Sequence, residues 1–343
     1  YTACREKAVL IDLSSLRKFE ILGPDAEELM DYTLTRNVKK LSVGQIVYSS
    51  MCYENGSMFD DGTLLKMSDH GFRWVCGDEY AGEWLKEQAK KKKFNVLVKN
   101  STDQINNISL QGPNSRKILE KFIFTPPTQP SISELQWFRF TICRVKELSG
   151  IPLMVSRTGY TGELGYEIWC HPSDAPAVWD VLMEAGKDEG IIPAGFGALD
   201  LLRIEAGLIL FGNEFDGQVD PFEAGVGFTV PLKTKTADFI GKEALIKRKE
   251  NPQKKLVGLE LVGKEKANHG DCVHIGRSQV GVVTSGCLSP TLNKNIALCR
   301  IDVGHSEIGM NVEVGKIDGH QKRIPAKVVG FPHYDPQKTR VKS

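Results

Sequence analysis

Hydrophobic and polar positions alternate in short runs through the first hundred residues, with helical stretches between them. Residues 8–14 and 18–22 are largely apolar and predict strands, and residues 72–76 predict another. A helix is expected over 78–93, with lysines at its C-terminal end and three large side chains on one face, Tyr80, Trp84 and Leu85. This order predicts an antiparallel α+β module that ends near residue 100.

The segment 45–67 has the pattern of two extended runs joined by Asn55-Gly56, a dipeptide that favours a two-residue hairpin turn. The returning run carries two adjacent carboxylates, Asp60 and Asp61. Neighbouring side chains on a strand point to opposite faces, so one of the two is expected to face inward, where a carboxylate in apolar surroundings needs a partner. In the alternative, both acids lie in water in a second turn with Gly62, and the segment by itself favours this alternative.

The rest of the chain divides into two further units. From about 102 to 213, strands alternate with helices, which are expected over 114–122, 175–188 and 198–207. From about 216 onward, short strands recur between turns that contain Gly and Pro, which is typical of an all-β sandwich or barrel. The strands expected there are 256–262, 280–285, 296–301, 311–314 and 326–329. The charged residues near the C-terminus, Lys338, Arg340 and Lys342, are expected to form a solvated end.

Composition disfavours several classes of partner and site. Lys and Arg number 44 and Asp and Glu 43 in 343 residues, so no global field attracts nucleic acid or an anionic membrane. No apolar run is long enough to span a bilayer, and no secretory signal is recognised. The eight cysteines form no C-x-x-C pair and no cluster with histidine at zinc spacing. We therefore expect reduced thiols, no metal site and a cytoplasmic protein.

Local signals of chemistry also have ordinary structural explanations. The glycine-rich loop 158–165 lacks the pattern of a phosphate cradle and fits a tight loop beside a planar ligand, with Glu167 following it. Asp200 and Arg203 have the spacing of an ion pair on a helix. Three aromatic residues could form a cage for a methylated cation, although aromatic residues at helical spacing usually pack in a core: Trp74, Tyr80 and Trp84. From residues and spacing alone, no reaction follows.

Nine segments, in order along nearly the whole chain, resemble those of the aminomethyltransferase family, whose namesake is the T-protein of the glycine cleavage system. They are VLIDLSSLRKFEILGPDA (9–26), IVYSSMCYENGSMFDDG (46–62), LQGPNSRKIL (110–119), SRTGYTGELGYEI (156–168), DLLRIEAGLILFGNE (200–214), DPFEAGVGF (220–228), DFIGKEAL (238–245), VGLEL (257–261) and VGVVTSGCLSPTLNKNIAL (280–298). The resemblance implies an α+β cloverleaf of three domains around a central hole where tetrahydrofolate binds. It implies three domains. Residues 1–15 and 102–213 form the first, residues 16–101 form the second, and residues 216–343 form a barrel-like third. Since family chains carry further residues before the IDLS match, we expect the start at Tyr1 to be truncated.

The same resemblance implies roles for individual residues. Asp61 corresponds to the family's aspartate near folate N5 and N10 and is the expected catalytic residue, because a carboxylate there can steer protons. Glu167 corresponds to the glutamate that binds the pterin, whose adjacent N–H donors suit a carboxylate. Tyr48 and Tyr160 are expected in the same pocket, and Tyr334 is the candidate for the aromatic residue that closes it.

This chain departs from the family pattern at three positions. Leu199 stands where the family has an arginine that contacts folate, so folate is expected to be held differently. Cys76 replaces an asparagine, and Ser15 replaces a histidine. Trp74, Cys76 and Tyr80 are the residues expected to contact the donor substrate.

We therefore expect a folate-dependent enzyme that transfers a methyl group from a small methylated amine, betaine or sulfonium donor to N5 of tetrahydrofolate. The first alternative is aminomethyl transfer in glycine cleavage, which yields 5,10-methylene-tetrahydrofolate and ammonia and requires a lipoylated H-protein as partner. The second is a non-catalytic folate-binding protein of the kind that assists iron–sulfur cluster assembly. It is disfavoured because residues 238–243, DFIGKE, lack the cysteine of that group's K-G-C-x-x-G-Q-E signature.

Overall fold

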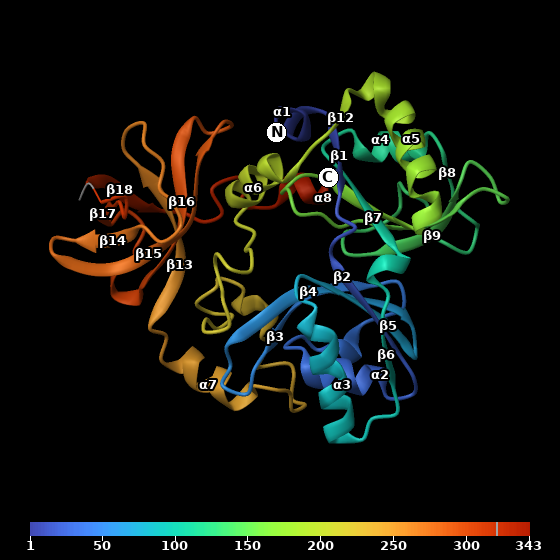
Figure 1. Ribbon diagram of the computed structural model, residues 1–343, viewed down its shortest axis with the longest axis horizontal. Coiled ribbons are helices and arrows are strands. Elements are labelled where there is room, and N and C mark those ends of the chain that lie inside the picture. The colour runs from blue at the N-terminus through green and yellow to red at the C-terminus, as the bar shows by residue number, and fades with distance from the viewer. Residues whose placement is uncertain (320–321) are drawn as a thin grey trace.

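Three lobes surround a central region in the computed structural model, which describes residues 1–319 and 322–343 (Figure 1). They are a seven-stranded sheet with helices, a five-stranded sheet with helices, and a closed barrel. The helix α6 (Phe196–Glu205) lies between the barrel and the other two lobes in Figure 1. The predicted α+β class with a C-terminal barrel is thereby confirmed, while the exact domain boundaries stay a prediction.

The first lobe is a seven-stranded sheet in the order β12-β1-β7-β11-β10-β9-β8. Its strands are β1 (Ala8–Asp12), β7 (Asn106–Gln111), β8 (Ile123–Phe124), β9 (Phe140–Val145), β10 (Pro152–Ser156), β11 (Gly165–Cys170) and β12 (Ile191–Pro193). Its helices are α1 (Thr2–Glu6), α4 (Ser115–Glu120) and α5 (Ala175–Gly186). The core contains Leu110 of β7, Ile168 of β11 and Leu182 of α5. Burial of these apolar side chains unites β1 with strands about a hundred residues later.

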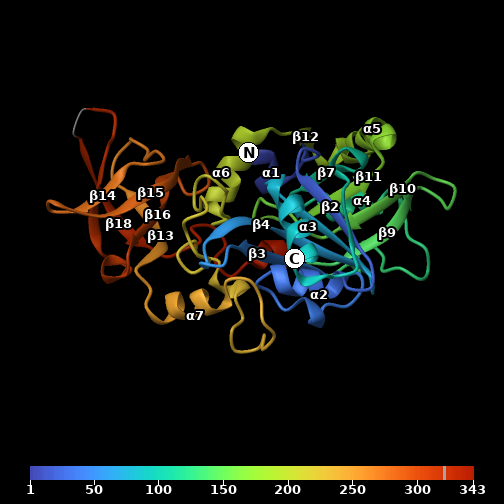
Figure 2. The same ribbon diagram turned by 60° about the horizontal axis from the view of Figure 1, so that its bottom comes forward.

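The second lobe is a five-stranded sheet in the order β3-β4-β5-β2-β6. Its strands are β2 (Arg17–Leu22), β3 (Ile46–Cys52), β4 (Met58–Ser68), β5 (Gly71–Cys76) and β6 (Leu97–Asn100). Its helices are α2 (Ala26–Thr33) and α3 (Tyr80–Lys92), whose apolar residues Leu29 and Leu85 share a core with Phe72 and Trp74. The strand β3 is at the edge of this sheet, next to the central region (Figures 1 and 2).

The predicted hairpin β3–β4 is present, but its turn is longer than expected. Cys52 pairs with Met58, so residues 53–57 form the connection. Gly56 has a φ of 82°, whereas Asn55 is not among the residues with positive φ. A two-residue type I′ turn needs positive φ at both positions, so that part of the prediction is wrong. The Asn55 side chain instead accepts a hydrogen bond from the backbone N–H of Ser57 at 2.9 Å.

No second turn interrupts β4 at its two acids. The strand runs from Met58 to Ser68, with Asp60 paired to Met51 and Asp61 to Ser50. Asp60 is 1% exposed. The alternative in which both acids lie in water is therefore wrong, and the alternation rule for a strand holds.

The third lobe is a closed barrel in the order β13-β16-β15-β14-β17-β18. Its strands are β13 (Lys254–Leu261), β14 (Cys272–Ile275), β15 (Ser278–Ser289), β16 (Lys294–Asp302), β17 (Asn311–Gly315) and β18 (Arg323–Val329). The helix α7 (Lys242–Glu250) precedes it and α8 (Thr339–Lys342) follows it. Short 3-10 helices are η1 (Val38–Lys40), η2 (Thr102–Gln104), η3 (Pro172–Asp174), η4 (Lys187–Glu189), η5 (Gly227–Thr229) and η6 (Val303–His305). The strand β14 and the helix α7 were not expected from the sequence pattern.

The C-terminal segment is bound to the first lobe. Arg340 Nε lies 2.6 Å from Glu163 Oε2, and its Nη2 donates to the backbone oxygen of Arg5 at 2.8 Å. The Glu163 side chain is buried, and a buried charge requires such partners. The expectation of a solvated end is therefore wrong for Arg340. In the part of the chain that the structure describes, no helix has both the length and the apolar character to cross a membrane.

Candidate functional site

A hydrogen-bonded pair, Asp61 and Tyr48, lies at the edge of the five-stranded sheet. Asp61 pairs with Ser50, two residues beyond Tyr48 on β3, so the two side chains project from the same face. The Tyr48 hydroxyl donates to Asp61 Oδ2 at 2.5 Å. Burial raises the pKa of Asp61 to about 6, and the bond from Tyr48 opposes part of that rise. A carboxyl group with this pKa can exchange protons near neutrality, as acid–base catalysis requires.

The neighbouring Asp60 points to the other side of β4, into the protein. Its Oδ1 accepts the backbone N–H of Asp61 at 2.9 Å, and its Oδ2 accepts that of Asp78 at 3.4 Å. Burial first, and then the charge of Asp61, raises the pKa of Asp60 to about 8, although a hydrogen bond with Cys76 lowers it in part. Asp60 is therefore mostly protonated at neutral pH, and Asp61 is the carboxyl group that ionises.

A second polar site is formed by Glu167 of β11, on the seven-stranded sheet. Asn107 Nδ2 donates to Glu167 Oε1 at 2.8 Å, and the Thr158 hydroxyl donates to Oε2. Asn107 is fully buried, and its Oδ1 has no hydrogen-bond partner within the described residues. Burial raises the pKa of Glu167, while the two hydrogen bonds and the charge of Lys18 lower it. A carboxylate beside an unpaired amide oxygen can accept hydrogen bonds from a ligand that presents several N–H donors.

Asn107 was not among the residues expected at the site, although the sequence contains a signal for it. Along β7, the polar residues Asn107, Ser109 and Gln111 alternate with Ile108 and Leu110. All three polar side chains are buried. A polar strand face that is buried must find partners, and the unpaired oxygen of Asn107 leaves room for one from a ligand.

Tyr160 lies where the loop 158–165 meets α6. Its hydroxyl donates to the backbone oxygen of Ile209, and burial raises its pKa above the ordinary range. Leu199 is 5% exposed and belongs to the same apolar cluster as Tyr160 and Leu202. The position at which the resemblance implies an arginine is thus part of an apolar core in this chain.

The predicted ion pair on α6 is present. Arg203 Nε lies 2.8 Å from Asp200 Oδ1, and Nη1 lies 2.8 Å from Glu214 Oε2. Arg203 is almost completely buried, so two carboxylates compensate its charge. These ion pairs are enough to explain why the Arg203 side chain is buried, without a role in binding or catalysis.

The residues expected to contact the donor lie in or beside the core of the second lobe. Trp74 has no exposed surface and Cys76 is 3% exposed, and both belong to the core that α2 and α3 cover. Tyr80 is half-exposed at the start of α3, with its ring centroid 5.9 Å from that of Phe59. The burial of Trp74 agrees with core packing rather than with a substrate contact, and a donor contact by Cys76 or Tyr80 stays a prediction.

Tyr334 belongs to a charged cluster between the N- and C-terminal segments. Its hydroxyl donates to Glu163 Oε1 at 2.7 Å, and its ring centroid lies 4.0 Å from the guanidinium carbon of Arg5. Arg5 also pairs with Glu205, at 2.5 Å between Nη2 and Oε2. The contacts of Tyr334 are therefore with this cluster, and its role in closing a folate pocket stays a prediction.

A cavity of about 620 Å³, which we call the central groove, has Tyr48 among its lining residues. Its walls come from segments that lie far apart in the sequence: Arg36 and Lys40 before β3, Trp137 before β9, Phe228 in η5, and Lys338 before α8. The groove therefore gives the Asp61–Tyr48 pair a neighbouring space into which a ligand can extend.

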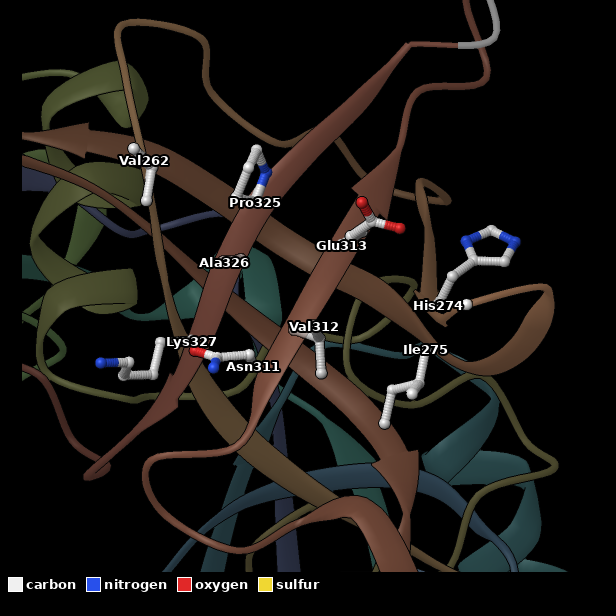
Figure 3. Close-up of a pocket in the computed structure, with 10 residues that line it drawn as sticks. Val262, His274, Ile275, Asn311, Val312, Glu313, Pro325, Ala326 and Lys327 are labelled. Atoms are coloured by element: carbon white, nitrogen blue, oxygen red, sulfur yellow. The ribbon is translucent and has the colours of Figure 1, made fainter.

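A second cavity, of about 390 Å³, lies on the barrel among β14, β17 and β18 (Figure 3). Figure 3 shows His274 and Glu313 on neighbouring strands, with their side chains separated from each other. None of its lining residues lines the central groove. No group of three or more His, Cys, Asp or Glu that could hold a metal ion occurs among residues 1–319 and 322–343. The barrel cavity thus has no chemistry comparable to that of Asp61.

Comparisons with known proteins agree with this geometry. The family model of the GCVT N-terminal domain matches residues 1–234, and that of the glycine cleavage T-protein C-terminal barrel domain matches residues 254–335. Trimethylamine-oxide aldolase of Ruegeria pomeroyi is 59% identical over the whole chain, which spans only 44% of that protein. Aminomethyltransferase of Symbiobacterium thermophilum is 40% identical over 97% of the chain and 88% of its own length.

The solved structures include one that matches almost the whole chain. Glycine cleavage system aminomethyltransferase T from Bartonella henselae has a TM-score of 0.84 and 26% identity, with 97% of this chain and 88% of that chain covered. Both sheets and the barrel are thus included in a single match. The two family models together match most of the sequence, and the two relatives named above are enzymes. The chain therefore belongs to the glycine cleavage T-protein family.

Proposed function

We propose that this chain transfers a one-carbon unit from a small methylated amine to tetrahydrofolate, with Asp61 as the group that takes and returns the proton. The observation that carries the proposal is the Asp61–Tyr48 pair. It combines a partly buried carboxyl group, a pKa near 6 and an adjoining cavity. General acid–base catalysis needs this combination of access and proton affinity.

The pterin would be held by Glu167 and Asn107. The carboxylate of Glu167 is already oriented by two hydrogen bonds, and Asn107 Oδ1 is a buried acceptor without a partner among the described residues. A pterin edge with adjacent N–H donors satisfies both groups at once. Leaving an amide oxygen buried and unpaired costs roughly 1–3 kcal/mol, so a ligand donor there contributes to affinity.

Bound tetrahydrofolate supplies the nucleophilic N5 amine that accepts the carbon. Asp61, ionised above about pH 6, takes the proton that this amine loses as its bond to carbon forms. Its negative charge also stabilises the positive charge that develops on the nitrogen. Tyr48 holds the carboxylate in one orientation through its hydrogen bond to Oδ2. Asp60 fixes the backbone of Asp61, because its Oδ1 accepts the hydrogen bond from the N–H of Asp61.

The methyl donor is inferred from the relative named trimethylamine-oxide aldolase. Cleavage of an N-oxide in the manner of an aldolase leaves a secondary amine and one carbon at the oxidation level of formaldehyde. Joining that carbon to both folate nitrogens yields 5,10-methylene-tetrahydrofolate and water. This would be a different product from the 5-methyl-tetrahydrofolate expected from direct methyl transfer. The chain spans 44% of that relative, so what is proposed for this chain is the capture of the released carbon on folate.

Aminomethyl transfer from a lipoylated H-protein is the second candidate. It is favoured by the 40% identity to an aminomethyltransferase of which the chain covers 88%. It would also yield 5,10-methylene-tetrahydrofolate, together with ammonia. The release of ammonia and the need for the protein-bound donor distinguish it from the first candidate.

The experiment is incubation with tetrahydrofolate and a panel of one-carbon donors, with the folate product identified by mass. Formaldehyde, trimethylamine N-oxide, dimethylglycine and aminomethylated H-protein are tested separately, each with wild type and with Asp61→Asn. Faster formation of a one-carbon folate than without protein, reduced by about 10²–10⁴-fold in Asp61→Asn, supports the proposal. An equal rate in the variant would exclude the proton-transfer role of Asp61.

A further inference from the structure

The polypeptide passes between the first and the second lobe twice. The first crossing, residues 13–16, joins β1 to β2, and the second, residues 101–105, joins β6 to β7 and contains η2. Figure 1 shows β1 and β2 in succession where the two lobes meet. Each lobe carries one part of the proposed site, since Asp61 is on β4 and Glu167 is on β11. The geometry of the two crossings therefore sets the distance between the proton-transfer group and the pterin site.

A single buried lysine binds both crossings. Lys18, near the start of β2, has no exposed surface. Its Nζ donates to the backbone oxygens of Ser14 at 2.9 Å and Leu16 at 2.8 Å in the first crossing, and to that of Thr102 at 3.5 Å in the second. An ammonium group has three N–H donors, and these bonds use all of them. None of the three acceptors is a carboxylate, so the side chain binds backbone rather than a counter-charge.

The main chain of Lys18 reinforces the same link. Its N–H donates to Thr102 Oγ1 at 3.1 Å, and its backbone oxygen accepts the N–H of Ser101 at 2.8 Å. Burial first, and then the charge of Arg73, lower the pKa of Lys18 to about 8, so the side chain is mostly charged at neutral pH. Burying that charge costs free energy, which the hydrogen bonds to the two crossings must offset.

The first crossing leads directly to the pterin site. Ser14 Oγ accepts the backbone N–H of Asn107 at 3.2 Å, and the N–H of Leu13 donates to the backbone oxygen of Asn107 at 2.9 Å. Asn107 Nδ2 in turn donates to Glu167 Oε1 at 2.8 Å. Burial raises the pKa of Glu167, and the charge of Lys18 is among the influences that lower it, so the ammonium is within electrostatic range of the pterin site. Lys18 is thus connected through Ser14 to the pair that would bind the pterin.

Lys18 also lies level with Asp61 across the five-stranded sheet. It pairs with Val75 of β5, and Val75 pairs with Thr63 of β4, two residues beyond Asp61. Backbone hydrogen bonds join these three strands, so we expect Lys18 and Asp61 to keep their separation. A change in how Lys18 binds the crossings would therefore move Asp61 relative to Glu167.

We propose that Lys18 is a positioning residue: by binding the backbone of both crossings, its ammonium group fixes the separation between Asp61 and the pterin site. This inference rests on the proposed function and adds to it a residue that acts through Asp61. Proton transfer requires Asp61 to be within hydrogen-bond reach of the folate amine, and a misplacement of about 1 Å can lower a rate by about 10²-fold. Loss of the ammonium should therefore lower turnover far more than it lowers folate affinity.

The test is Lys18→Met, which removes the ammonium group and keeps a side chain of similar length. With a donor that supports turnover, we expect kcat to fall by about 10–100-fold. The dissociation constant for tetrahydrofolate should change by less than about threefold. A structural role alone would instead lower the fraction of folded protein and leave kcat per folded molecule unchanged. Urea unfolding followed by circular dichroism measures that fraction, so that each rate is expressed per folded molecule.

Lys235 provides a matched control. It too has no exposed surface, and its Nζ donates to three backbone oxygens, those of Asp31, Leu34 and Arg36. These bonds join the second lobe to the segment after η5 and make no link to the first lobe. Lys235→Met should lower the urea midpoint but leave kcat per folded molecule close to that of wild type. A loss of kcat equal to that in Lys18→Met would indicate a general effect of losing a buried charge and would overturn the inference.

A double-mutant cycle shows whether Lys18 acts through Asp61. If it does, Lys18→Met should lower kcat by less than about twofold in the Asp61→Asn background. Multiplicative losses would mean that the two residues act independently, which contradicts the inference. Thr102→Val deletes the acceptor of the Lys18 N–H and should give a smaller loss of kcat with the same dependence on Asp61. This milder variant keeps the test decisive if Lys18→Met does not fold.

The outcomes separate this inference from the proposed function. If Asp61→Asn turns over as fast as wild type, or if no donor yields a one-carbon folate, the proposed function is refuted and the inference falls with it. If Asp61→Asn is slow but Lys18→Met and Thr102→Val both keep the wild-type kcat, the proposed function stands and the positioning role is wrong. If Lys18→Met weakens folate binding as much as it lowers kcat, Lys18 serves the pterin site alone, and the inference is again overturned.

Discussion

Replacing Tyr48 with phenylalanine tests the acid–base role of Asp61 without removing its carboxyl group. The substitution deletes only the hydroxyl that donates to Asp61 Oδ2 at 2.5 Å. A hydrogen bond to a carboxylate stabilises the ionised form, so its loss makes the proton harder to remove. The pKa of Asp61, which burial has already raised to about 6, should therefore rise further.

The size of the change follows from the strength of that bond. Hydrogen bonds to charged groups contribute about 1.5–3 kcal/mol, and 1.36 kcal/mol corresponds to a change of one in pKa. We expect Tyr48→Phe to raise the pKa of Asp61 by about 1 to 2. If ionised Asp61 is the base, the fraction of active enzyme at pH 6 falls from about one half to about a tenth or less. At pH well above the new pKa the rate should recover.

The assay is the pH dependence of kcat/KM for tetrahydrofolate between about pH 5 and about pH 9. Wild type should lose activity as the pH falls through about 6, and Tyr48→Phe should lose it at a pH about 1 to 2 higher. Asp61→Asn should have no such acid limb. An acid limb at the same pH in wild type and Tyr48→Phe, with an intact fold by circular dichroism, would refute the assignment of that limb to Asp61.

Three further predictions concern Asp60, Glu167 and Tyr334. Asp60→Asn should flatten the pH dependence of the free energy of unfolding. In wild type the folded pKa of Asp60 is about 8, above the ordinary 3.8, so the free energy of unfolding falls by up to roughly 1.4 kcal/mol per pH unit as the pH rises between these two values. Urea midpoints from about pH 5 to about pH 8 check this, and an identical slope in the variant would contradict it. Glu167→Gln should weaken tetrahydrofolate binding by about 10–100-fold, which titration calorimetry can verify. The acid limb of the pH–rate profile should stay in place. Unchanged affinity would remove Glu167 from the pterin site. Tyr334→Phe should lower the free energy of unfolding by about 1–2 kcal/mol through loss of the bond to buried Glu163, with folate affinity unchanged. A clear loss of folate affinity in that variant would instead support the pocket role expected from the sequence.

Strands and helices could be predicted from the sequence wherever the local pattern of apolar and polar residues determines the structure. The period of two in β4 gave the correct alternative, that one of Asp60 and Asp61 faces inward, although the segment by itself favoured both acids in water. The turn before it was predicted less well, because Asn55-Gly56 became part of a longer connection over 53–57. A register shift between Met51 and Cys52 accompanies the longer connection.

The site residues were likewise predicted only in part. The family resemblance indicated Asp61, Glu167 and Tyr48, and the structure gives each a polar partner suited to its expected role. Trp74 was expected to contact the donor, but it has no exposed surface. Sequence distance along a strand does not tell which face of the sheet a helix will cover.

The sequence by itself determined most of the order of elements and the family to which the chain belongs, and it indicated Asp61 and Glu167 as candidate site residues. The tertiary structure decided which groups meet. Asn107 and Glu167 are 60 residues apart and share a hydrogen bond because β7 and β11 are neighbours in one sheet. The central groove combines Arg36, Trp137 and Lys338, which no local pattern connects. The pKa values of Asp60 and Asp61 differ for the same reason, since burial acts through neighbours supplied by the whole fold.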